Sequence, residues 1–120
     1  MLRNVVRVFH CDDSSSFRVL VREVLSDYED VELVGEAGSP AEALAGVAAA
    51  QPDIVLLDLL PPESRGDLVT ELHRLVPDAK IVVYSGYPET VARERHPDAC
   101  AYLEKAASFE RLHETLRTAA

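Results

Sequence analysis

The chain has 120 residues, 48% of them hydrophobic, which suits one packed domain covering residues 1–120. Its net charge is −9, so we do not expect this domain to bind nucleic acid or an anionic membrane surface directly. No apolar run approaches the roughly 20 residues that span a bilayer. The interrupted start MLRNVVRVFH is unlike a secretory signal. We therefore expect a cytoplasmic protein.

Strand-like and helix-like apolar patterns alternate along the chain. Short β-branched or aromatic runs predict strands, and stripes with helical spacing predict helices. In chain order these are strand Val5–Phe9, helix Phe17–Leu25, strand Val31–Ala37, helix Ala41–Ala48, strand Ile54–Leu57, helix Leu68–Val76, strand Ile81–Tyr84, helix Thr90–Arg95, strand Ala99–Leu103 and helix Phe109–Leu116.

Boundary residues agree with this division. Ser39 and Glu42 form a capping box with Pro40 at the first helical position, and Pro97 ends the short fourth helix early. Regular alternation of strands and helices predicts an α/β fold with a parallel sheet. Right-handed crossovers favour a flavodoxin-like (βα)5 arrangement, with a five-stranded sheet of order 2-1-3-4-5.

Polar side chains follow four of the five predicted strands, at the ends where open α/β sheets carry their functional crevice. They are Asp12 and Asp13 after the first strand, Asp58 after the third, Ser85 after the fourth and Lys105 after the fifth. Three converging carboxylates repel one another unless cations offset their charge. Mg²⁺ fits best, with Mn²⁺ as an alternative, because it accepts one or two carboxylates and keeps waters and phosphate oxygens as further ligands.

Taken singly, these residues have ordinary explanations. Asp12 and Asp13 could form a helix N-terminus, Ser85 a turn, and Lys105 a solvated surface residue. Asp58 is harder to explain in this way, because a carboxylate that ends a buried apolar run is costly without a partner. Lys105 is one of only two lysines in the chain. The joint pattern therefore favours a functional site.

Four segments resemble the response-regulator receiver family of two-component signalling: CDDSSSFRVLV, DIVLLDLLPPESRGD, IVVYSGY and AYLEK. The resemblance covers the whole chain in order. The stretch GEAGSPAEALAGVAAAQPDIVLLDLLPP is most similar to receivers that carry a C-terminal helix-turn-helix DNA-binding domain. The resemblance therefore implies control of transcription through a domain that this chain lacks.

The resemblance also implies roles for single residues. Asp58 would accept a phosphoryl group from a histidine kinase or a phosphotransfer protein, and Ser85 and Lys105 would contact that group. Mg²⁺ would be held by Asp13, by Asp58, by the backbone carbonyl of Leu60, and by Asp12 mainly through water.

Two further implications concern the response to phosphorylation. Tyr102 matches the family's switch aromatic, which would act together with Ser85. The fourth helix, fifth strand and fifth helix would form the surface that changes and through which a homodimer could form. Leu60 cannot orient an attacking water and Tyr87 could shield the acyl phosphate, so we expect slow self-dephosphorylation. We expect no enzymatic activity beyond this reaction and self-phosphotransfer.

Some positions depart from the family pattern, and other functions stay open. Ala106 stands where many members have a proline after the lysine, which leaves the isomer of the Lys105–Ala106 peptide open. The main alternative is a free-standing or phosphorylation-independent receiver that acts as a protein-binding module. A phosphohydrolase is less favoured, because such enzymes usually carry a second Asp at the position of Leu60.

Overall fold

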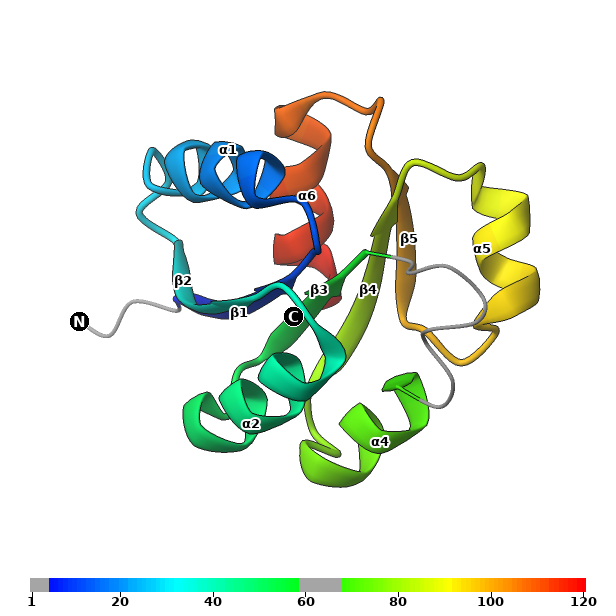
Figure 1. Ribbon diagram of the computed structural model, residues 1–120. Coiled ribbons are helices and arrows are strands. Elements are labelled where there is room, and N and C mark those ends of the chain that lie inside the picture. The colour runs from blue at the N-terminus through cyan, green and yellow to red at the C-terminus, as the bar shows by residue number, and fades with distance from the viewer. Residues whose placement is uncertain (1–4, 59–67) are drawn as a thin grey trace.

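The computed structural model describes residues 5–58 and 68–120, and within them helices cover both faces of a parallel five-stranded sheet (Figure 1). The elements are β1 (Val6–Cys11), α1 (Ser15–Leu25), β2 (Val31–Ala37), α2 (Pro40–Ala50), β3 (Ile54–Leu57), α4 (Leu68–Leu75), β4 (Lys80–Ser85), α5 (Glu89–Arg95), β5 (Ala101–Glu104) and α6 (Phe109–Ala119).

The strands are ordered β2-β1-β3-β4-β5, and all the pairings are parallel. This confirms the predicted flavodoxin-like order. The boundaries differ slightly from the prediction: β5 begins at Ala101 instead of Ala99, and α1 begins at Ser15, before its first apolar residue. Apolar spacing marks where an element is buried, whereas its hydrogen-bonded ends also depend on caps.

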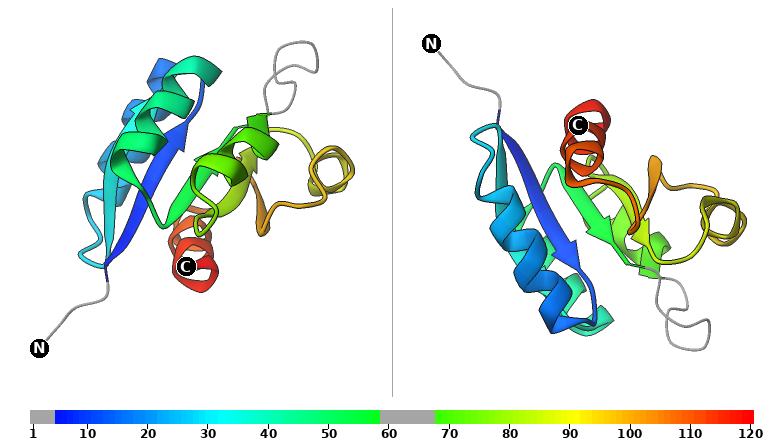
Figure 2. Two further views of the ribbon diagram at one scale, coloured as in Figure 1. Left: turned by 90° about the horizontal axis from the view of Figure 1, so that it is seen from below. Right: turned by 90° about the horizontal axis from the view of Figure 1, so that it is seen from above.

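The sheet separates two main cores. One packs α1 and α6 against Val8, Ile54, Leu56 and Val82, and the other packs α2 and α4 against Phe9, Val55 and Ile81. In Figures 1 and 2, α5 lies beside β5, far from β2. β3 is buried on both faces, as expected for a central parallel strand, so only its two ends are open to chemistry.

Local capping fixes where the helices start. Ser14, Ser39 and Ser108 each accept a hydrogen bond from the backbone N–H three residues later. The Glu42 carboxylate accepts one from the N–H of Gly38, one residue before the cap. The loops after β1, β2 and β5 therefore turn directly into helices, which keeps their polar residues at the sheet edge. Within the described ranges, no helix is long and apolar enough to cross a membrane.

Candidate functional site

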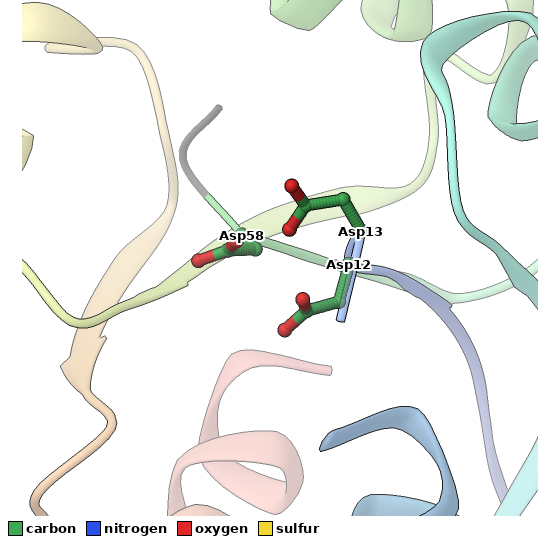
Figure 3. Close-up of side chains that lie close together, drawn as sticks. All are labelled: Asp12, Asp13 and Asp58. Carbon is green, nitrogen blue, oxygen red and sulfur yellow. The ribbon is translucent and has the colours of Figure 1, made fainter. Parts of the chain in front are cut away.

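Three carboxylates meet where β1 and β3 end (Figure 3). Asp12 and Asp13 follow β1, and Asp58 follows β3 directly, with its N–H donating to the carbonyl of Cys11 at 2.9 Å. One carboxylate oxygen from each residue lies within 4.8 Å of the others. Asp12 and Asp58 are buried and Asp13 is exposed, so the cluster opens to solvent on one side. Hard oxygen ligands in this arrangement suit a divalent cation such as Mg²⁺.

Lys105 supplies the positive charge that the sequence predicted. Its Nζ lies 2.8 Å from Oδ2 of Asp12 and 3.3 Å from Oδ1 of Asp58, and 4.3 Å from the ring centroid of Phe17. Burial lowers the pKa of Lys105, but hydrogen bonds and charge from the two carboxylates outweigh burial and raise it above the ordinary value. The ammonium therefore stays protonated between two of the three carboxylates.

Lys105 nevertheless does not fully compensate the negative charge of the three carboxylates. Burial raises the pKa of Asp58 from 3.8 to about 6, the charge of Asp12 adds to this effect, and Lys105 opposes it. A single ammonium therefore leaves the ionised form of Asp58 less stable than it is in water. A cation bound between the carboxylates would favour that form.

Ser85 and Lys105 come from neighbouring strands at the same edge. Ser85 ends β4 and is buried, and its Oγ accepts a hydrogen bond from the N–H of Tyr87 at 2.9 Å. Its carbonyl accepts the N–H of Lys105 at 2.7 Å, which ties the residue after β5 to the end of β4. The five predicted polar residues Asp12, Asp13, Asp58, Ser85 and Lys105 thus all lie at the carboxyl ends of the strands.

The aromatic residues predicted to modulate the site lie next to α5. Tyr102 is 9% exposed, its hydroxyl donates to the carbonyl of His96, and the guanidinium carbon of Arg93 lies 4.4 Å from its ring centroid. Tyr87 is 40% exposed, with the guanidinium carbon of Arg95 5.0 Å from its ring centroid. Tyr102 therefore occupies an inward position, whereas Tyr87 stands at the surface.

Two other predictions concern the backbone near the site. No cis peptide bond occurs in the described residues, so the Lys105–Ala106 peptide is trans. Leu60, proposed as a carbonyl ligand and as a determinant of lifetime, lies outside the described residues.

His10 and Cys11 are the last two residues of β1, directly before Asp12, and both are buried. His10 Nε2 lies 3.8 Å from Oδ2 of Asp12, and neither ring nitrogen has a hydrogen-bond partner within the described segments. Burial lowers the pKa of His10 to about 4, so its ring is neutral near pH 7. Burial also raises the pKa of Cys11 to about 12, which makes its thiol unreactive.

Arg18 also contacts the site, although it is not among the residues predicted from the sequence. Its Nη1 donates to the backbone carbonyl of Asp12 at 2.5 Å, and its side chain is 22% exposed. The available signal was its place beside Phe17, in the second turn of a helix that begins just after Asp13. A charged residue next to the apolar stripe there can reach back to the strand end.

The sequence matches a known protein family and individual known proteins. The family model described as response regulator receiver domain matches residues 8–117. The DNA-binding transcriptional activator DevR/DosR of Mycobacterium tuberculosis is 37% identical over 84 residues, which cover 69% of this chain and 39% of that protein. The response regulator protein VraR of Staphylococcus aureus is 29% identical over 115 residues, covering 93% of this chain and 55% of that protein. The chain thus spans about half or less of these relatives.

The fold is also similar to those of solved receiver-domain structures. The signal receiver domain of the response regulator NarL from Mycobacterium tuberculosis has 31% sequence identity and a TM-score of 0.78, with 97% of both chains covered. A CheY-like receiver domain protein from Methanospirillum hungatei, at 24% identity, has a TM-score of 0.72 with 96% of both chains covered, a likeness of fold alone.

Proposed function

The chain belongs to the response regulator receiver family of two-component signalling, and from this premise we propose that Asp58 accepts a phosphoryl group from a histidine kinase or a phosphotransfer protein. The observation that carries the proposal is the convergence of Asp12, Asp13 and Asp58 with the Lys105 ammonium between two of them. An ionised carboxylate at the open end of a rigid buried strand is a competent nucleophile toward phosphorus.

In the proposed step, a carboxylate oxygen of Asp58 bonds to phosphorus while the bond from phosphorus to the donor's imidazole nitrogen breaks. The imidazole leaves with the bonding electron pair and then takes up a proton. Asp13, Asp58 and the carbonyl of Leu60 would hold Mg²⁺, or Mn²⁺ in its place, and Asp12 would hold it mainly through water. The cation would neutralise negative charge on the transferred group. Lys105 is already 3.3 Å from Asp58 and would contact the same phosphoryl oxygens.

The output surface would be formed by α5, β5 and α6, which are the fourth helix, fifth strand and fifth helix of the sequence prediction. Ser85 would move toward the phosphoryl group, releasing the N–H of Tyr87 that it now accepts. Tyr102 would respond to that movement, since it belongs to β5 and packs with Val83 of β4 and Ala92 of α5. This surface is also the proposed site of homodimer formation.

Transcriptional control through a DNA-binding domain elsewhere in a longer protein is the favoured output, because DevR/DosR carries that description and this chain covers only part of its length. The domain would act in the cytoplasm and would have no enzymatic activity beyond self-phosphotransfer and slow self-dephosphorylation. The second candidate is a receiver that binds partners without phosphorylation.

Intact-mass measurement after incubation with Mg²⁺ and a small phosphodonor tests the acceptor role. We expect one added phosphoryl group in the wild type and none in Asp58→Asn. Asp53→Asn is a matched control, because Asp53 is an exposed carboxylate just before β3, at its opposite end, and this variant should be modified normally. An adduct that persists in Asp58→Asn would exclude Asp58. A folded wild type that binds Mg²⁺ but forms no adduct would favour the binding module.

The lifetime of the phosphorylated state is a separate test. Leu60 offers no hydrogen bond to an attacking water, and Tyr87 stands at the surface beside the end of β4, so we propose slow hydrolysis. The double variant Leu60→Asn/Tyr87→Glu should shorten the half-life measured by mass spectrometry after removal of the donor. An unchanged half-life would exclude these two side chains as its determinants. Repeated turnover of a phosphate ester by the wild type would instead indicate an enzyme.

A further inference from the structure

Arg18 connects α1 to the peptide that carries two of the three site carboxylates. Its Nη1 donates to the backbone carbonyl of Asp12 at 2.5 Å, and that carbonyl belongs to the peptide bond between Asp12 and Asp13. A charge-assisted hydrogen bond of this length restricts rotation of the peptide plane. A tilt of this peptide plane would change the direction in which both side chains leave the end of β1.

The guanidinium is itself held in place by the end of β2. Its Nε lies 3.8 Å from Oε1 of Glu36, and Glu36 accepts two further hydrogen bonds from Arg22, at 2.6 and 2.9 Å. Gly38 leaves the space that the guanidinium fills, because a Cβ at that position would lie 2.9 Å from Nη1 of Arg18. The side chain of Arg18 therefore lies between the carbonyl of Asp12 on one side and Glu36 and Gly38, at the end of β2, on the other.

A second backbone contact fixes the same residue from the other side. The N–H of Asp12 donates to the carbonyl of Ala37 at 2.9 Å, and its Oδ1 accepts the N–H of Ser14 at 2.8 Å. The hydrogen bond from Arg18 to the carbonyl of Asp12 adds a further restraint on how the chain turns from Asp12 into Asp13.

We propose that Arg18 is a positioning residue for the cation site, which aims the carboxylates of Asp12 and Asp13 at Asp58 without binding the cation. This inference rests on the proposed cation site. Mg²⁺ demands near-ideal octahedral geometry, so a tilted Asp12–Asp13 peptide should weaken its binding. The positive charge of Arg18 by itself disfavours a cation, so any benefit must come from geometry. Charge and geometry can therefore be separated by experiment.

Gly38→Ala separates them, because it changes no charge and its new methyl group would displace the guanidinium. We expect the Mg²⁺ dissociation constant, measured by isothermal titration calorimetry, to rise about tenfold, the lower end of the range for lost supporting contacts around metal ligands. In an Arg18→Met background the same Gly38→Ala change should have no further effect. Gly86→Ala is the matched control, because a Cβ there meets nothing within 4 Å.

Thermal unfolding without Mg²⁺ establishes that each variant is folded at the titration temperature, and the amide NMR shift of Asp13 reports the peptide directly. An Mg²⁺ affinity of Gly38→Ala within twofold of the wild type would overturn the inference. An equal loss in the Arg18→Met background would also overturn it, because the effect would then not pass through Arg18. Asp13→Asn tests the cation site itself. A wild type that does not bind Mg²⁺, or binds it no better than Asp13→Asn, would overturn that site and this inference together.

Discussion

Replacing Asp58 by Asn should stabilise the metal-free protein. Folding raises the pKa of Asp58 from 3.8 to about 6, through burial and then the charge of Asp12. An acid with a raised pKa costs stability once it is ionised, so the penalty is complete above about pH 6 and fades as the pH falls toward 4. At about 1.4 kcal/mol per pH unit, this difference corresponds to about 3 kcal/mol at neutral pH. Asn keeps the shape of Asp and removes the charge.

Urea unfolding in a chelator at pH 7.5 and at pH 4 measures the effect. We expect Asp58→Asn to raise the free energy of unfolding by about 3 kcal/mol at pH 7.5, which is roughly 10 °C in the melting temperature. At pH 4 the difference should nearly vanish, since the wild-type carboxyl is then protonated. Asp27→Asn replaces an exposed carboxylate just after α1 and should change stability by less than about 0.5 kcal/mol.

Mg²⁺ adds a further comparison. A ligand that binds only the folded state stabilises it in proportion to the logarithm of its concentration above the dissociation constant. Saturating Mg²⁺ should therefore stabilise the wild type more than Asp58→Asn and narrow the gap between them. No gain at pH 7.5 would refute the electrostatic reasoning. A gain of equal size at pH 4 would refute it too, because that effect would follow from shape and not from charge.

Three further changes test other parts of the structure. Gly46→Ala should lower the free energy of unfolding, measured with urea, by about 1–3 kcal/mol despite the higher helix propensity of Ala, because the new Cβ would lie 2.5 Å from the ring of Phe9. A higher free energy of unfolding would contradict this packing. His10→Leu should reduce the decrease in the free energy of unfolding between pH 6.5 and pH 4, because the lowered pKa of His10, about 4, makes the folded protein less stable as the pH falls through that range. If the variant loses as much stability over this range as the wild type, His10 is not the cause of the decrease. Lys105→Met should raise the pKa of Asp58 by about one unit or more in a carboxyl ¹³C NMR titration, because the ammonium lowers it; an unchanged value would remove Lys105 from the site.

Much of the fold could be predicted because local and global signals agree. The strand order follows from alternating apolar patterns and right-handed crossovers. The capping box at Ser39 is realised, with the Ser39 side chain accepting from Glu42 as expected. Asp58 was identified because a carboxylate after four fully buried residues needs a partner, and Lys105 supplies one at 3.3 Å.

The rest depends on tertiary geometry that apolar spacing does not encode. Arg18 lies next to the apolar stripe of α1, and its contact with the carbonyl of Asp12 depends on how α1 is rotated over β1 and β2. The inward position of Tyr102 depends on a backbone carbonyl of the α5 terminus, six residues earlier in the chain. Sequence spacing predicts which strand end a residue occupies, but not which backbone group its side chain will reach.

The two positively charged side chains near the site, Lys105 and Arg18, have different roles. This division leaves the site carboxylates with too little positive charge to balance them. Lys105 is placed against carboxylate side chains, where it stabilises Asp12 and Asp58 only in part, as the raised pKa of Asp58 indicates. The charge of Arg18 is engaged by Glu36, while its Nη1 holds the backbone. If Arg18 instead paired with the site carboxylates, it would relieve their repulsion and leave less to gain from a bound cation. Using Arg18 for geometry keeps the site short of positive charge, and that deficit favours binding of Mg²⁺ beside an ionised Asp58.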